Sequence, residues 1–505
     1  MSRLKSLSLV GLKGELVDIE TIIHRGLPAF TIVGLPDASI QESRERVRAA
    51  LKQSGFEFPR GKIALNLAPA DLKKQGPRFD LAIALGILEA HKQLVIPPEY
   101  KEALLLGELG FNGEIRPIIG VLPSVYSAAQ KGIKTVILPE ANADEAALIE
   151  SVEVLGVKNL RQLCDFFTTG EGLNKTEFSG FAQTKTLAIP THDFCFIKGN
   201  EIAKRGLEIA AAGGHNVLMN GPPGSGKTML ARAFSTVLPE LTFEESLDIT
   251  QVHSIAGCLD PSEPVLRKRP FRAVHHTASG VAIVGGGNPP RPGEISLAHR
   301  GVLFLDEFAE FNAKTLEVLR QPLEDGEIRI SRAAGSVSYP AQFSLVAAMN
   351  PCPCGFYRDP KKDCTCAPFA VQRYRQKISG PILDRIDVHL QVPRVEVADL
   401  TKEERSESSD KVRERVQTAR NEQLTRFKGL EIVCNADMNS AQVQKYCVLD
   451  EAGAQLLNQV VEKMQLSGRA YYRTLKLART IADLAGEPNI ASHHVAEAVQ
   501  YRELQ

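Results

Sequence analysis

The sequence predicts an α/β protein of several domains, with a parallel sheet in its middle part and helices at its C-terminal end. The chain has 505 residues, too many for one ordinary hydrophobic core, and this length suggests roughly three domains. Strand and helix patterns alternate through residues 1 to about 165, and a buried strand, a glycine-rich loop and a helix follow one another at 216–234. From Ser440 onward the pattern is helical.

Composition, charge and cysteine usage limit the classes of partner. Hydrophobic residues make up 43% and charged residues 24%, so global disorder is not expected. Sixty basic residues balance sixty acidic ones, so any nucleic-acid surface must be local. Residues 1–5 lack the apolar run of a signal peptide, and no stretch reaches the roughly 18 apolar residues of a membrane span, so no membrane partner is expected. Five scattered cysteines suit reduced thiols in a cytoplasmic protein.

The first predicted domain covers residues 1–167. It alternates strands with helices. Strands are expected at 30–34, 62–67 and 135–138, and helices are expected at 39–54 and 80–88.

Three further regions follow along the chain. The segment 168–190 is polar and glycine-containing, which predicts a linker. Residues 191–395 carry most of the motifs and form the second domain. Residues 396–505 begin with a highly charged stretch, interpreted as a solvated helix and connector, and end with a helix expected at about 491–504.

The glycine-rich loop is a phosphate-binding P-loop by its setting between a strand (216–219) and a helix (228–234). Glycines let backbone N–H groups close around phosphates, and the helix N-terminus adds positive partial charge. Lys227 is expected to reach the β- and γ-phosphates of ATP, and Thr228 offers its hydroxyl to Mg²⁺. The whole loop consists of Gly221, Pro222, Pro223, Gly224, Ser225, Gly226, Lys227 and Thr228.

Two more strands end in polar residues that suit the same site. The apolar run 302–305 is typical of a buried parallel strand and ends in Asp306, which is expected to hold Mg²⁺, and Glu307, which is placed to polarise the attacking water. The run 343–349 ends in Asn350, which could sense the γ-phosphate, although Asn before proline is also a common turn.

Four cysteines form a C-x-C-x₉-C-x-C cluster at Cys352, Cys354, Cys364 and Cys366. Four thiolates can bind zinc tetrahedrally, although the inner spacing of one residue is shorter than the usual two to four. We expect structural zinc, with free thiols or a redox disulfide as the alternatives. The residues around the cluster are basic.

The order of these strands, together with Pro222-Pro223, resembles an AAA+ ATPase. Further motifs resemble the magnesium-chelatase-like branch and, within it, the YifB/ComM family, and this resemblance covers nearly the whole chain. One departure is Asn200, where relatives usually carry Gln, and the shared carboxamide makes this a small difference. The motifs lie at 213–216, 322–326, 379–387 and 478–484.

The resemblance implies roles for residues outside the P-loop. Asn350 would be sensor 1, and Arg385 would be an arginine finger that projects into the ATP site of a neighbouring subunit. Its alternative is a structural arginine paired with Asp384 or Asp387. Sensor 2, on a C-terminal helical lid, would be Arg469 or Arg473.

The resemblance also implies two insertions in the ATPase core that could touch DNA. Residues 275–292 are placed like a loop inserted into helix 2, and 327–339 give a hairpin signal before sensor 1. Arg329 and Arg332, or the helix-2 loop, could grip DNA, although strict alternation puts the two arginines on opposite faces. The alternative is that Arg329 and Arg332 are ordinary solvated arginines without a role in DNA binding.

The N-terminal region resembles the Lon-protease/ribosomal-S5-like fold through residues 106–109 and 113–118. Arg78 or Phe79 stands where a protease would carry its nucleophilic serine, and Ser124 stands where its lysine is expected. Without nucleophile and base, peptide hydrolysis has no mechanism. We therefore expect a non-proteolytic scaffold or a DNA-engaging domain, with phosphate contacts from Lys73, Lys74 and Arg78 or with these as ordinary charges.

Taken together, the resemblance implies an ATP-driven homohexameric motor that acts on single-stranded and branched DNA. Its role would be branch migration during natural transformation and homologous recombination, with recombination proteins among its partners. The alternatives are a metal-chelatase-type motor subunit and an ATPase that remodels proteins, or an ATP-dependent protease, which the missing dyad disfavours.

Overall fold

The computed structural model describes residues 1–177, 192–260, 262–332, 335–396, 406–430, 432–465 and 467–502. The chain divides into two compact units that interleave along the sequence. The first unit comprises Met1–Gln183, Phe243–Arg267 and Ser331–Tyr339, and the second comprises Thr184–Thr242, Lys268–Ile330 and Pro340–Gln505. Most of the predicted linker at 168–190 lies outside the described residues.

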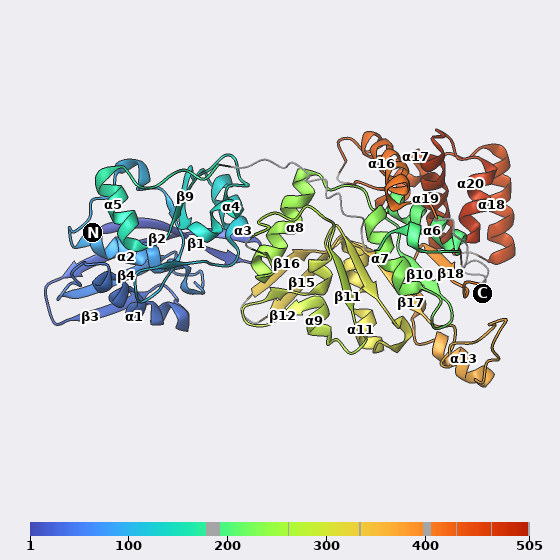
Figure 1. Ribbon diagram of the computed structural model, residues 1–505, viewed down its shortest axis with the longest axis horizontal. Coiled ribbons are helices and arrows are strands. Elements are labelled where there is room, and N and C mark those ends of the chain that lie inside the picture. The colour runs from blue at the N-terminus through green and yellow to red at the C-terminus, as the bar shows by residue number, and fades with distance from the viewer. Residues whose placement is uncertain are drawn as a thin grey trace. The chain divides into compact units, whose positions relative to one another are not determined.

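The first unit is built on a seven-stranded mixed sheet in the order β3-β4-β2-β1-β5-β8-β9 (Figure 1). Strand β2 pairs antiparallel with β1 and β4, and the other neighbours are parallel. The predicted strands at 30–34, 62–67 and 135–138 are confirmed as β3, β4 and β8. The strands are β1 (Ser2–Val10), β2 (Lys13–His24), β3 (Ala29–Val33), β4 (Lys62–Ala68), β5 (Leu104–Leu105), β8 (Thr135–Pro139) and β9 (Glu153–Val157).

Helices complete the core of the first unit. The two predicted helices are confirmed as α1 (Ala38–Gln53) and α2 (Asp80–Ala90), and α2 is apolar on all sides because every residue from Asp80 to Leu88 is buried. Helix α8 (Phe243–Ala256) belongs to this unit and packs on α3 (Val121–Gln130). Smaller elements are β6 (Glu108–Leu109), β7 (Ile115–Arg116), α4 (Ala143–Ala146) and α5 (Leu160–Thr169).

The second unit contains a five-stranded, wholly parallel sheet in the order β11-β14-β17-β10-β18 (Figure 1). The strands predicted at 216–219, 302–305 and 343–349 are confirmed as β10, β14 and β17, and the apolar residues of all three are buried. Their bounds are β10 (Val217–Asn220), β11 (Phe271–Val274), β14 (Val302–Leu305), β17 (Ser344–Met349) and β18 (Val388–Gln391). The predicted parallel-sheet core is therefore correct.

Helices α6 (Glu201–Gly213) and α7 (Lys227–Val237) pack with this sheet, and a helical segment follows it to the C-terminus. The predicted C-terminal helices are confirmed, and the last one spans Ser492–Gln500. They are α16 (Ser409–Arg426), α17 (Ser440–Tyr446), α18 (Glu451–Met464), α19 (Gly468–Ala485) and α20 (Ser492–Gln500).

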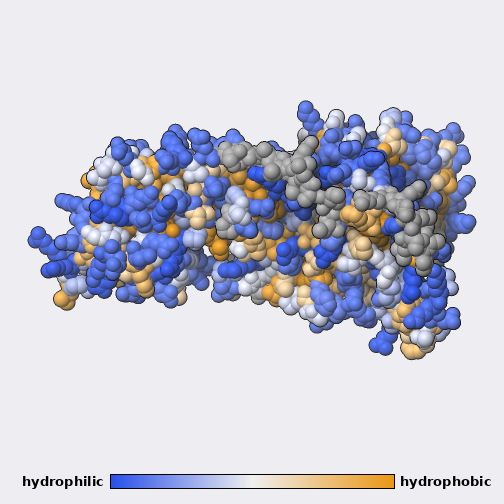
Figure 2. Space-filling model, viewed as in Figure 1, coloured by the Kyte–Doolittle hydropathy of each residue, from blue (hydrophilic) through white to orange (hydrophobic). Residues whose placement is uncertain are grey.

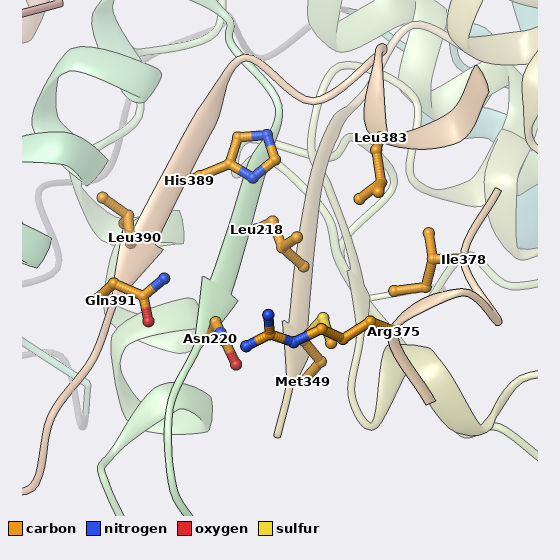
Figure 3. Close-up of a pocket in the computed structure, with 9 residues that line it drawn as sticks. All are labelled: Leu218, Asn220, Met349, Arg375, Ile378, Leu383, His389, Leu390 and Gln391. Carbon is orange, nitrogen blue, oxygen red and sulfur yellow. The ribbon is translucent and has the colours of Figure 1, made fainter. Parts of the chain in front are cut away.

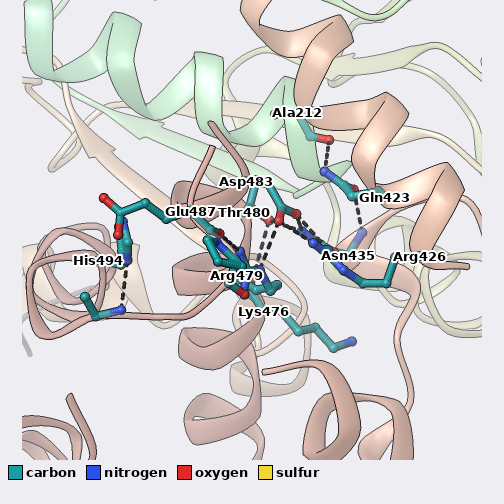
Figure 4. Close-up of polar contacts among 12 residues, drawn as sticks. Ala212, Gln423, Arg426, Asn435, Lys476, Arg479, Thr480, Asp483, Glu487 and His494 are labelled. Atoms are coloured by element: carbon teal, nitrogen blue, oxygen red, sulfur yellow. Dashed lines mark hydrogen bonds and ion pairs between the residues drawn. The ribbon is translucent and has the colours of Figure 1, made fainter. Parts of the chain in front are cut away.

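A buried polar network holds the C-terminal helices together (Figure 4). The carboxylate of Asp483 on α19 accepts hydrogen bonds from Arg426 on α16 (2.8 Å), from the amide of Asn435 (2.8 Å) and from Arg479 (3.0 Å). Gln423 on α16 donates to the carbonyl of Ala212 on α6 (3.1 Å). Because these charges are paired in the interior, the helices have one preferred arrangement relative to α6.

Short elements lie outside the two large sheets, and residues Ser331–Tyr339 of the hairpin among them belong to the first unit. The predicted hairpin at 327–339 is confirmed as the two-stranded sheet of β15 (Glu327–Arg332) and β16 (Gly335–Pro340). Among the described helices, none is long and apolar enough to cross a membrane. The remaining elements are α9 (Gly280–Val284), β12 (Gly285–Gly286), β13 (Arg291–Pro292), α10 (Glu294–Leu297), α11 (Ala313–Glu317), α12 (Arg320–Asp325), α13 (Pro368–Arg375) and α14 (Gly380–Leu383).

Candidate functional site

The candidate site lies at the carboxyl edge of the parallel sheet in the second unit. Strands β14, β17 and β10 are neighbours in that order, so the residues that follow them meet at one edge. Ligands of open α/β sheets bind outside the carboxyl ends of the strands. The loop after β10 carries Gly224 and Gly226 with φ of 75° and 90°, a backbone region that favours glycine, and it ends at the N-terminus of α7.

Lys227 is buried beneath this loop and bonds to the loop itself. Its Nζ donates to the carbonyls of Gly221 (2.6 Å) and Pro222 (3.0 Å) and to Oδ1 of Asn350 (3.3 Å). Burial lowers the pKa of Lys227 to about 8. An anion bound here would restore the charged form, so the geometry suits a ligand with phosphate groups.

The two residues predicted to hold Mg²⁺ touch one another. Thr228 donates from Oγ1 to Oδ2 of Asp306 at 2.9 Å. Both are oxygen ligands of the kind that Mg²⁺ prefers, and neither is enclosed, which leaves room for waters and substrate phosphates. The chemistry of this donor pair therefore fits a magnesium ion that accompanies a nucleotide.

Glu307 does not point freely into the site. Its carboxylate lies 2.8 Å from Nδ1 of His276, which follows β11, and its backbone is left-handed with φ of 53°. His275, His276 and Glu307 form a compact cluster. The sequence did not reveal His276 as a residue of this site. The signal that could have identified it is its position just after β11, the strand next to β14.

The three candidate arginines have different surroundings. Arg385 is only 5% exposed and is bonded to the carboxylate of Glu324 and to the carbonyl of Pro381. Arg473 pairs with Asp387 at 2.9 Å. Arg469 is exposed in the first turn of α19, and no carboxylate of the described residues pairs with it.

Asp387 ties the sheet to the helical segment. Besides Arg473, its carboxylate contacts Nδ1 of His215 at 3.2 Å, and the other ring nitrogen of His215 lies 2.9 Å from Oγ1 of Thr480 on α19. Burial alone would raise the pKa of the Asp387 carboxyl, but the charge of Arg473 and the contact with His215 hold it well below its usual range. Asp387 is thus committed to these partners rather than to Arg385.

The four clustered cysteines converge directly after Asn350. The Sγ atoms of Cys352 and Cys354 are 3.4 Å apart, and the Sγ of Cys364 lies 3.7 and 3.6 Å from them. Cys366 joins them, since its Sγ accepts from the N–H of Cys354 at 3.4 Å. Tetrahedral zinc–thiolate bonds of about 2.3 Å place sulfurs about 3.8 Å apart. The four thiols therefore fit a zinc ion, and all nine cysteines are free of disulfides.

The residues predicted to touch DNA are only partly accessible. Arg329 on β15 is 65% exposed on its side chain, and its Nε donates to Glu327 at 2.6 Å. The side chain of Arg332 lies outside the described part of the structure. In the first unit Lys73 is exposed, but Lys74 is buried and donates to the carbonyl of Pro69.

Arg78, the third candidate in that unit, is buried and hydrogen-bonded to its neighbours. Its guanidinium donates to Oγ of Ser124 (3.0 Å) and to the carbonyl of Ile119 (2.8 Å). Ser124 in turn donates to the carbonyl of Gly120 at 2.6 Å. Burial lowers the pKa of Arg78 to about 10. The positions expected for a serine nucleophile and a lysine base do meet, but an arginine and a hydroxyl occupy them and satisfy each other.

Three family models match the chain. The model described as magnesium chelatase, subunit ChlI, matches residues 193–400, that of subunit ChlI of Mg-chelatase matches 19–142, and that of the subunit ChlI C-terminal region matches 406–502. The chain is 43% identical over 495 residues to the competence protein ComM of Haemophilus influenzae, covering 98% of this chain and 96% of that protein. It is also 43% identical to the uncharacterized protein YifB of Escherichia coli over 494 residues, covering 98% and 95%.

A further match covers a smaller part of the chain. Lon protease 2 of Bacillus subtilis is 35% identical over 126 residues, which cover 24% of this chain and 22% of that protein. With the parallel sheet, its loop and the C-terminal helices, these matches define a magnesium-chelatase-like AAA+ protein with a Lon-like part. Within that class, the chain belongs to the YifB/ComM family.

Proposed function

We propose that this protein binds ATP with magnesium at the edge of the second unit's sheet and hydrolyses it. The observation that carries the proposal is the convergence of Lys227, Thr228, Asp306 and Asn350 from three neighbouring strand ends. Lys227 would bind the β- and γ-phosphates, Thr228 and Asp306 would hold the magnesium ion, and Glu307 would orient the attacking water. Bound magnesium supplies positive charge that offsets the charge of the phosphates.

We take a homohexameric ring as the working form, in which a neighbouring subunit completes the site. Arg385 would leave Glu324 and reach the ATP of the neighbouring subunit, where a trans arginine is worth about 10³–10⁵ in rate. Arg469 is the better candidate for sensor 2, because it is exposed while Arg473 is engaged by Asp387. Cys352, Cys354, Cys364 and Cys366 would hold a structural zinc ion beside this site.

The proposed substrate is single-stranded and branched DNA, with branch migration during natural transformation as the biological activity. The name of the competence protein ComM, 43% identical over nearly the whole chain, supports this substrate class. The hairpin of β15 and β16, with Arg329 exposed, would supply DNA contacts together with Arg332. Arg329→Ala/Arg332→Ala should then weaken DNA binding and flatten its salt dependence.

A strand-exchange assay on a three-strand DNA junction, with and without ATP, tests the proposal. The expected result is ATP-dependent movement of the junction together with an ATPase rate that rises when DNA is added. An ATPase that ignores DNA and moves no junction would contradict it. That outcome would favour a second candidate, a chelatase-type motor that remodels a protein partner, which the family matches to magnesium chelatase subunit ChlI support.

A further inference from the structure

The segment 352–377 has an unusual charge for this chain. The whole sequence is neutral, yet this segment carries six basic and only two acidic residues. All six basic side chains are exposed. They are Arg358, Lys361, Lys362, Arg373, Arg375 and Lys377.

The acidic residues do little to neutralise this surface. Asp359 is engaged by other groups, because its Oδ1 accepts the N–H groups of Lys361 (2.8 Å) and Lys362 (3.2 Å) and its Oδ2 pairs with Arg394 (3.3 Å), outside the segment. Among the six basic side chains, the ion pair found within the described residues is that of Lys377 with Glu310 at 3.0 Å. Most of the positive charge therefore faces solvent without a carboxylate partner in the described structure.

The same segment presents aromatic surface among its charges. Phe369 on α13 is 70% exposed, and the rings of Phe356 and Tyr357 lie under cationic side chains, with Lys362 Nζ 4.0 Å from the centre of the Phe356 ring. Figure 2 shows this part of the surface as mostly hydrophilic with a small apolar patch. Basic side chains that follow a phosphate backbone, with an exposed ring on which a base can stack, are the combination that binds single strands.

The segment is in direct contact with the candidate ATP site of the same unit. A Cβ added to Gly355, whose φ is 84°, would lie 2.5 Å from Cδ of Pro223 in the P-loop, so the Gly355 backbone lies close against the Pro223 ring. Arg375 reaches from α13 into a pocket that it shares with Asn220, at the end of β10, and Met349, before sensor 1 (Figure 3). A ligand bound to this segment would therefore act directly on the elements that are proposed to hold the nucleotide.

We infer that the exposed basic face of residues 352–377, the knuckle surface, binds single-stranded DNA through its phosphates, with Phe369 offering a ring to one base. This site is separate from the hairpin of β15 and β16. It rests on the proposed function in that the protein is taken to act on DNA. The charge complementarity and the contact with Pro223 make it the point where DNA is sensed beside the nucleotide.

The test uses the full-length protein and fluorescence anisotropy with a fluorescein-labelled oligo(dT) at several salt concentrations. The variant Lys361→Ala/Lys362→Ala/Arg373→Ala should bind about ten-fold more weakly or worse, and its slope of log K against log salt should fall by about 2, since each phosphate contact on a single strand contributes about 0.7. Phe369→Ala should weaken binding by about five-fold or more.

Matched controls remove the same groups elsewhere. Arg44→Ala/Arg48→Ala/Lys52→Ala removes three exposed cations from α1, where exposed Glu42 and Glu45 lie among them, and Phe111→Ala removes a ring that is 63% exposed in the first unit. Both controls should stay within two-fold of wild type. If the alanine variant unfolds at a lower temperature than wild type, the corresponding glutamine variant, which also removes the charges, replaces it.

The outcomes separate this inference from the proposed function. If wild type binds oligo(dT) and the knuckle variants bind equally well with an unchanged salt slope, the knuckle surface is not the DNA site, while the proposed function stands. If wild type binds no DNA and its ATPase ignores branched DNA, both fall. If oligo(U) displaces oligo(dT) at a far lower concentration, the ligand is RNA and the assignment to DNA is overturned.

Discussion

Two places in this molecule begin a helix after a left-handed glycine and gather polar side chains beside it. In the second unit Gly226 precedes α7, and in the first unit Gly120 precedes α3. At α3 the protein uses its own groups, because the N–H of Leu122 donates to Glu145 (2.9 Å) and the N–H of Gly120 donates to the carbonyl of Ser254 (3.2 Å). At α7, no acceptor among the described residues binds the N–H of Gly226 or Lys227.

The difference separates a place that still offers hydrogen-bond donors to a ligand from one whose donors are already used. A site that binds a charged ligand keeps donors unused until the ligand arrives, whereas buried donors that are already satisfied have nothing left to offer. Arg78 and Ser124 satisfy each other, while Lys227 is held by loop carbonyls that a phosphate can replace.

Arg385→Ala should lower ATP turnover by about 10³–10⁵, because the charge that a neighbouring subunit supplies to the transition state is lost. The measurement is steady-state phosphate release at protein concentrations where the chain assembles. Mixing Arg385→Ala with Lys227→Ala should restore part of the activity, since the second variant still supplies Arg385 to sites of the first. Full turnover by a monomeric Arg385→Ala protein would show that no trans arginine is needed.

Glu307→Gln should lower the hydrolysis rate by about 10²–10³ and leave ATP binding in place, because the amide cannot polarise the attacking water. Single-turnover hydrolysis and nucleotide binding are measured side by side. The control is Glu310→Gln, an exposed acid three residues along that pairs with Lys377. Equal losses in both variants would point to general disruption of this edge rather than to a role for Glu307.

Much of the candidate ATP site could be located from the sequence because its parts are local. The strand, loop and helix around Lys227 occupy one short stretch, and the buried strands of 302–305 and 343–349 are uninterrupted apolar runs. The fold class and the strands β3, β4, β8, β10, β14 and β17 followed from the same periodic patterns, whereas the other strands of the two large sheets were not predicted. The partner of Glu307 could not, because His276 comes from a different strand end and only the sheet order brings them together.

Other features depended on long-range packing and were out of reach. The charged stretch after residue 396 gave no hint that Arg426 would bind Asp483, which is far along the chain and buried with it. The sequence offered Arg469 and Arg473 evenly, and only the pairing of Arg473 with Asp387 distinguishes them. Likewise, α8 lies between motifs of the ATPase core in sequence but packs in the first unit, so contiguity along the chain did not reveal its place.

ATP affinity should fall as pH rises above 8. Burial holds the pKa of Lys227 near 8 in the free protein, and bound phosphates favour its charged form. Below pH 8 the amine is already charged, so affinity is flat; above pH 8 each binding event must take up a proton, and affinity should drop about ten-fold between pH 7 and pH 9. Calorimetry on the Glu307→Gln background, in two buffers of different ionisation enthalpy, measures the affinity and the proton uptake. A flat profile without proton uptake would show that the free lysine keeps its ordinary pKa.

Arg78→Met should have the smallest effect on ATP hydrolysis, within about two-fold, because the Arg78–Ser124 pair of the first unit is not expected to contact the nucleotide. It should still lower the stability of that unit by about 1–3 kcal/mol, since the buried hydroxyl oxygen of Ser124 loses its donor. Thermal unfolding and ATPase rate are measured on the same preparation, with Arg60→Met, an exposed arginine of the same unit, as the control.

The position of Arg78 gives the opposite result a clear meaning. Arg78 donates to Ile119 and Ser124 beside the α3 end that holds Ser254 of α8, and the chain enters α8 directly from the second unit. A ten-fold change in ATPase rate at unchanged stability would mean that this site, although closed to chemistry, transmits its packing to the ATP site through α8.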